Sequence, residues 1–224
     1  MKKTFYLLII FSVLTGMIKL YAQEEEETTQ FLLSEKTVFS GFGSPFVEFS
    51  SVNDEFAVCV GGGGALMIDQ TLFVGGYFEG LTTNHYMYDM ETIVGIEKPK
   101  VSFEHGGFWL GYVYKHKKAI HGGLSMKLGW GEIDLDGDDD DDGDDDPDSE
   151  FADNIFAISP QVEMELNLAA WFKINIGVGY RFVTGINATY VDNDNNHVKL
   201  YNTNDFNSPI GTISLLFGGF DKKE

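Results

Sequence analysis

The sequence has a single cysteine, Cys59, and few basic residues, and each shortage excludes a class of protein. One cysteine excludes an internal disulfide framework and any zinc or iron–sulfur site built from clustered cysteines. Only 15 lysines and arginines stand against 35 aspartates and glutamates, which gives a net charge of −20. Because so few cations form no basic face, we expect no nucleic-acid partner. The hydrophobic content of 43% nevertheless suffices for a packed core.

Long apolar runs are also scarce, and the one that stands out is Phe5–Ile18. Two lysines precede it, and Ala22 supplies a small residue at a cleavage point, so residues 1–22 have the pattern of a secretory signal peptide. A retained amphipathic anchor is the alternative. The run has 14 residues, too few to cross a bilayer core of about 30 Å as a helix. The rest of the chain is therefore either a secreted soluble protein or a membrane β-barrel.

The acidic residues are concentrated in two segments. Residues 132–153 contain 14 of them, and Glu24–Glu27 add four more. Runs of like charge repel and stay solvated, so we expect an acidic linker over residues 23–43 and an acidic loop over residues 132–153. The expected folded body is a barrel over residues 44–220, and residues 221–224 form a tail.

Apolar and polar residues alternate strictly in three segments, residues 119–130, 156–166 and 170–182. In the last of these, Phe172, Ile174 and Ile176 alternate with polar or small residues. A period of two places all the apolar side chains on one side of a strand, whereas a helix scatters them around its circumference. These segments are predicted to be strands.

Five further segments fit the same pattern more loosely, at residues 45–53, 55–68, 71–81, 101–114 and 210–220. The connections are of two kinds: short turns, and long polar loops at residues 85–99, 135–153 and 191–208. Long loops on one side and short turns on the other are typical of outer-membrane barrels. The sequence therefore predicts an all-β fold, an eight-stranded antiparallel up-and-down transmembrane β-barrel with three long loops on one side.

The direction in which the apolar face points separates this barrel from a soluble, lipocalin-like binding barrel. Aromatic residues on the apolar faces gather toward the strand ends, as the interface girdles of membrane barrels require. The opposite faces carry glycines and charges of both signs, and the interior of an eight-stranded barrel is just wide enough for side chains to fill. We therefore expect a network of paired charges in the lumen, formed by Glu48, Glu79, Lys127, Glu163, Glu165, Lys173 and Arg181.

The signal segment, the alternating strands and the closing Leu215–Phe220 segment resemble small outer-membrane barrels of the OmpA/OmpX type, and Gly41–Ser51 resembles uncharacterised outer-membrane barrel proteins. The resemblance implies a place in the bacterial outer membrane, contact with its lipid and lipopolysaccharide, and insertion by the barrel insertion machinery. Two features depart from the pattern. Asp221–Glu224 follow the closing aromatic, and no peptidoglycan-binding domain follows the barrel, so a wall-anchoring role does not carry over.

The aspartate run suggests a calcium site, because calcium prefers several oxygen ligands and the spacing Asp-x-Asp-x-Asp-Gly lets alternate carboxylates converge. The acid expected at the twelfth position is Ser149 instead, with Glu150 one place late. A solvated acidic loop that binds no ion is the competing interpretation. The candidate ligands are Asp134, Asp136, Asp138, Asp140 and Asp142, and no other cofactor is expected.

Lipid-modifying enzymes also occur on eight-stranded barrels, and such an enzyme would need a serine, a histidine and an acid close together. His105, His121 and Ser125 fall on the inward face, but no nucleophile-elbow motif accompanies them. We expect no catalytic residues. The predicted function is a non-enzymatic outer-membrane barrel with surface-exposed interaction loops. A small channel and a lipid-modifying enzyme are the alternatives.

Overall fold

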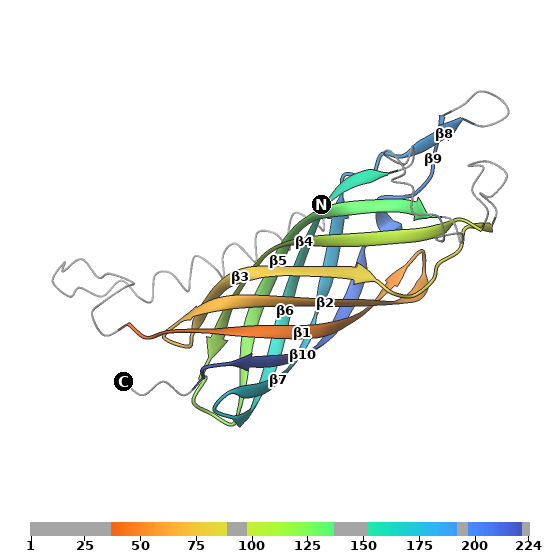
Figure 1. Ribbon diagram of the computed structural model, residues 1–224. Coiled ribbons are helices and arrows are strands. Elements are labelled where there is room, and N and C mark those ends of the chain that lie inside the picture. The colour runs from red at the N-terminus through yellow and green to blue at the C-terminus, as the bar shows by residue number, and fades with distance from the viewer. Residues whose placement is uncertain (1–36, 89–97, 137–151, 192–196, 221–224) are drawn as a thin grey trace, which may run out of the picture. The chain divides into compact units, whose positions relative to one another are not determined.

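The computed structural model describes residues 37–88, 98–136, 152–191 and 197–220, in which eight long antiparallel strands close into a barrel (Figure 1). Each strand pairs with its neighbours in sequence, and the first pairs with the last. This confirms the predicted fold. The barrel strands are β1 (Phe39–Val52), β2 (Glu55–Ile68), β3 (Leu72–Leu81), β4 (Lys100–Tyr114), β5 (Ile120–Asp136), β6 (Asp153–Ala169), β7 (Phe172–Thr184) and β10 (Ser208–Gly218).

The two ends of the barrel differ in their connections. One end, called the turn end, holds the short β2–β3, β4–β5 and β6–β7 turns. The other, called the loop end, holds the connections at residues 82–99, 137–152 and 185–207, together with the tight β1–β2 turn. Asn53 and Asp54 in that turn have φ of 51° and 61°, and Asp69 and Gln70 between β2 and β3 have 51° and 52°. Two-residue turns with both φ values positive match the twist of the flanking strands, which explains asparagine and aspartate there.

The connection from β7 to β10 contains structure that the sequence pattern does not predict. A small hairpin, β8 (Thr189–Val191) with β9 (His197–Lys199), projects from the loop end (Figure 1), and a short 3-10 turn, η2 (Thr203–Asp205), follows it. The backbone N–H of Asn53 donates to the carbonyl of Asp205 at 2.7 Å, so this connection is tied to the β1–β2 turn.

Several element boundaries differ from those expected. β1 begins at Phe39, so residues 39–43 belong to the barrel wall rather than to the linker. β10 ends at Gly218, and Phe220 is buried at the base of the lumen instead of closing the strand. Its backbone N–H donates to the carbonyl of Ala170, and its side chain lies on the same inward face as that of Leu216. The predicted signal peptide, the tail and most of the acidic loop lie outside the described residues. Within the described residues, no helix is long and apolar enough to cross a membrane.

The wall is apolar on its outside and charged on its inside. Leu66, Ile120 and Val178 point outward with 65%, 63% and 62% of their surface exposed. Arg181, by contrast, is fully buried. An exposed apolar surface that runs around a whole barrel is much larger than soluble monomers carry, and it matches the lipid-facing band of membrane barrels. The lipid-facing assignment of the alternating residues therefore follows from the structure.

Candidate functional site: the lumen and the loop end

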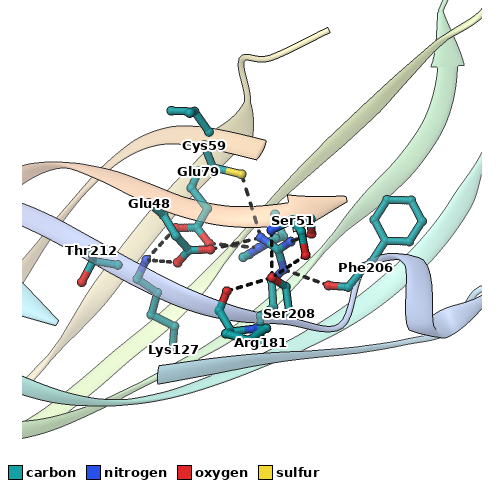
Figure 2. Close-up of polar contacts among 12 residues, drawn as sticks. Glu48, Ser51, Cys59, Glu79, Lys127, Arg181, Phe206, Ser208 and Thr212 are labelled. Carbon is teal, nitrogen blue, oxygen red and sulfur yellow. Dashed lines mark hydrogen bonds and ion pairs between the residues drawn. The ribbon is translucent and has the colours of Figure 1, made fainter. Parts of the chain in front are cut away.

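Four strands, no two of them adjacent in the sheet, contribute the main charges of the lumen. The guanidinium of Arg181 (β7) donates to the Glu48 carboxylate (β1) at 3.0 Å. The Lys127 ammonium (β5) lies 2.5 Å from Glu79 (β3) and 3.6 Å from the second oxygen of Glu48. The Glu48 carboxylate therefore lies between two cations, and Figure 2 shows these side chains converging across the lumen. We call these residues, with His105, the central charge cluster.

His105 joins this cluster through Glu79. Its Nε2 lies 3.1 Å from the Glu79 carboxylate, and its Nδ1 lies 2.9 Å from the Tyr77 hydroxyl. The Lys127 ammonium also sits 3.8 Å from the centre of the Phe46 ring, and the Arg181 guanidinium 4.7 Å from that of Phe103. Aromatic rings thus cover the cations on the sides that the carboxylates leave open.

A second group of charges lies nearer the turn end. The Glu165 carboxylate is 2.9 Å from His121 Nε2 and 2.9 Å from the Lys173 ammonium. The Lys173 ammonium in turn lies 4.3 Å from the centre of the Phe220 ring. The inward side chain of Phe220 therefore places an aromatic face over a buried cation at the base of the lumen.

Glu163 departs from the expected pairing. Instead of forming an ion pair, its carboxylate accepts two hydrogen bonds. One comes from the Ser125 hydroxyl and the other, at 2.9 Å, from the Asn175 amide. The two inward cations of β7 are engaged elsewhere, Lys173 by Glu165 and Arg181 by Glu48. The sequence places all seven predicted charged residues on the inward face, and the structure buries all seven. It joins six of them in ion pairs.

Apolar clusters fill the lumen on both sides of these charges, which the sequence does not predict. The cluster at the turn end consists of Phe42, Phe46, Ala65, Met67, Phe73, Tyr77, Trp109, Val113, Leu216 and Phe220. The cluster at the loop end combines inward residues of the strands with Leu200, Tyr201 and Phe206 from the last connection. Buried side chains therefore occupy the lumen along its length.

The inward glycines make room for these rings. A Cβ at Gly111 would overlap the ring of Phe73, and one at Gly63 would lie 3.0 Å from the Trp109 ring. In the run Gly61–Gly64, Gly61 and Gly63 therefore lie inward against the rings of Phe46 and Trp109, and the other two glycines lie on the outward face. Glycine in a strand often marks such a close approach.

Comparison with known proteins supports this architecture. No protein-family model and no curated protein matches the chain. The crystal structure of Neisserial surface protein A, from Neisseria, is similar at 10% identity and a TM-score of 0.51, over 84% of this chain and 100% of that one. The fold is that of a small outer-membrane β-barrel. Looser similarity extends to Ail, the attachment invasion locus protein of Yersinia pestis (12% identity, TM-score 0.44, 81% and 96% covered), and to a major outer membrane protein of Thermus thermophilus (9%, 0.43, 80% and 99%).

The predicted calcium ligands are only partly described. Asp134 and Asp136 lie on the outward face of β5 at its loop end, whereas Asp138, Asp140 and Asp142 lie outside the described residues. Asp134 Oδ1 accepts the backbone N–H of Leu135 at 2.6 Å. In the part of the chain that the structure describes, no three His, Cys, Asp or Glu side chains are grouped to hold a metal ion.

Below these aspartates, the outward face stays acidic. Glu104 on β4 and Glu132 on β5 are direct cross-strand partners. With Trp130 and Phe156 they line an open depression of about 680 Å³ on the outside of the wall. On the inner side of the same rim, burial and the carboxylate of Asp134 raise the pKa of Tyr201. The loop end of the barrel is therefore strongly negative.

Proposed function

We propose that this protein resides in the bacterial outer membrane as a closed, non-enzymatic barrel whose loop end faces the exterior as an interaction surface. The main support for this proposal is that side chains fill the lumen. A central charge cluster and two apolar clusters occupy the space through which a solute would pass. The long connections all lie at one end, so polar chain is available there for contacts.

The outward wall suits contact with outer-membrane lipid, and the acidic loop end suits lipopolysaccharide bridged by divalent cations. We also propose insertion by the barrel insertion machinery, which the closed antiparallel barrel supports. The exposed terminal aromatic on the wall is Phe217, which stacks on Phe172 with ring centres 5.0 Å apart.

Hydrolysis is disfavoured by how the polar residues are engaged. The Ser125 hydroxyl donates to Glu163 and not to a histidine, and both His105 and His121 are buried and bound to carboxylates. A serine nucleophile needs a base within hydrogen-bond reach and access for a substrate. Activity on outer-membrane lipid that disappears in a His121→Ala variant would overturn this part of the proposal.

A channel is the competing function, and conductance separates it from a closed barrel. We expect the purified chain in planar bilayers to show no stable ohmic steps, because the Arg181–Glu48 pair and the rings beside it fill the lumen. Steps of porin size would establish a channel with the lumen charges as its selectivity elements. The variant Phe206→Ala removes a ring from the apolar cluster at the loop end and tests whether that cluster blocks the passage of ions.

The acidity of the loop end favours a second function, the binding of divalent cations. Asp134 and Asp136 continue the outward acidic row of Glu104 and Glu132 toward the aspartate run. We propose calcium binding at about 10⁻⁴–10⁻³ M, as in extracellular sites. Titration calorimetry on the full chain should show weakened binding in Asp138→Asn/Asp140→Asn/Asp142→Asn and, to a smaller degree, in Asp134→Asn/Asp136→Asn.

The control for that titration removes two acids that also lie at the loop end but stand at the connection between β1 and β2. An Asp54→Asn/Glu55→Gln variant should bind calcium like the unmodified chain. An equal calcium response in all variants would contradict a site in the aspartate run.

A further inference from the structure

The β4–β5 turn at the turn end concentrates basic residues in an otherwise acidic chain. Lys115, Lys117 and Lys118 are all exposed, with His116 between them. Partial burial and the neighbouring Lys117 lower the pKa of His116, which disfavours the charged form of its imidazole. We call these residues the lysine turn.

The backbone of the lysine turn is fixed by the neighbouring strand. The Asn167 side-chain amide donates to the carbonyls of His116 and Lys118 at 2.9 and 2.8 Å. His121 Nδ1 donates to the same Lys118 carbonyl at 2.9 Å, and the Lys118 N–H closes the turn on the Lys115 carbonyl at 2.9 Å. The lysines therefore project from a preformed loop, and ligand binding does not have to order the backbone.

The turn lies immediately beyond a girdle of outward aromatic residues. Tyr112, Tyr114 and Trp171 are 43%, 53% and 61% exposed at the same end of the wall. The Lys115 ammonium lies 4.8 Å from the centre of the Tyr114 ring. Tyrosine and tryptophan in such girdles sit at the level of the lipid headgroups. Lysines one step further from the lipid tails are placed where headgroup phosphates lie.

The two ends of the barrel have opposite charge. Among the described residues outside the lumen, the turn end exposes a single acid, Asp69, against the three lysines. The loop end instead carries the outward acids Asp54, Glu55, Glu104, Glu132, Asp134 and Asp136 against the lysines Lys98, Lys100 and Lys199. A ligand with a negative headgroup is therefore attracted to one end and repelled from the other.

We propose that the lysine turn binds the phosphate groups of anionic phospholipids in the leaflet at the turn end. This inference rests on the proposed membrane position, which makes that leaflet the periplasmic one. Each lysine near an anionic membrane surface adds to the attraction, and salt screens it. The turn thereby recruits a ring of anionic lipid and fixes the depth of the barrel at that end.

Lipid retention measured by native mass spectrometry tests the proposal. The full chain is refolded into vesicles of phosphatidylcholine with or without phosphatidylglycerol. The protein is then released from the vesicles, and the lipids that stay bound are identified from the mass of the complex. We expect a preference for phosphatidylglycerol that falls about a hundredfold in the Lys115→Gln/Lys117→Gln/Lys118→Gln variant. A matched variant with Lys98, Lys100 and Lys199 changed to Gln loses the same charge at the loop end and should keep the preference.

The outcomes separate the two proposals. Unmodified protein that fails to insert, shown by the absence of a heat-modifiable band, contradicts the membrane position itself. Protein that inserts but retains phosphatidylglycerol equally with and without the three lysines overturns only the lysine-turn proposal. Displacement of the lipid by an equal concentration of inorganic phosphate would show a site for phosphate ions rather than for lipid, and would also overturn it.

Discussion

The two faces of the barrel wall reverse the usual arrangement of a soluble protein. On β7, Val178 points outward and is 62% exposed, whereas Arg181, three residues later, points inward and is fully buried. Apolar residues gain nothing from exposure to water, and a buried charge is stable only when it is paired. Lipid outside and paired charges inside satisfy both conditions at once. The wall is therefore understood only when its two faces are assigned different surroundings.

The largest expected effect comes from breaking the charge pairing of the inner face. Arg181→Met removes the cation 3.0 Å from Glu48 and leaves that carboxylate with the more distant Lys127. We expect the free energy of unfolding to fall by about 3–5 kcal/mol, because a buried charge is left without its partner. Urea unfolding of the barrel in lipid vesicles measures it. Adding Glu48→Gln should recover part of the loss, and a double variant no more stable than Arg181→Met would contradict the pairing.

The next effect comes from placing a charge on the outer face. Val178→Arg puts a cation near the middle of the lipid-facing band and should cost about 2–4 kcal/mol of unfolding free energy. Val178→Leu keeps the site apolar and serves as the control. If both variants unfold like the unmodified chain in the same vesicles, this face does not contact lipid tails.

The smallest of the three effects tests how the inner face is packed. Gly111→Ala inserts a methyl group where the Phe73 ring lies, and overpacking of this kind costs about 1–3 kcal/mol. Gly211→Ala is the matched control, because its Cβ would meet no atom within 4 Å. Thermal unfolding should separate the two variants, and combining Gly111→Ala with Phe73→Leu should restore stability. Equal stability of both glycine variants would show that the Phe73 ring does not require glycine at position 111.

The strands were predictable because alternation is a local property of the sequence. In residues 170–182 the parity of each position gives the face on which its side chain lies, so Lys173 and Arg181 were placed inside correctly. The partners of these residues were not predictable in the same way. Glu48 and Arg181 are 133 residues apart, and β10 lies between their strands, so their contact depends on barrel closure and register.

The burial of the apolar residues at the two ends of the lumen could not be predicted from the sequence, for related reasons. Phe73 and Gly111 are cross-strand neighbours, a relation that appears only once the register is known. Tyr201 and Phe206 come from a connection without a period, so no pattern indicates that they are buried. Phe220 keeps the parity of β10, in which Thr212, Ser214 and Leu216 point inward, but its contact with the Lys173 ammonium appears only in the folded chain.

Fluorescence of the three tryptophans in bilayers tests the reversal of the two faces most directly. Trp130 and Trp171 point outward and are 55% and 61% exposed, whereas Trp109 points into the lumen and is 2% exposed. In single-tryptophan variants, with phenylalanine at the other two positions, lipids with brominated acyl chains should quench Trp130, should quench Trp171 more weakly because it lies at the headgroup level, and should leave Trp109 bright. Strong quenching of Trp109, or no quenching of the other two, would contradict a barrel with lipid outside and a filled lumen within.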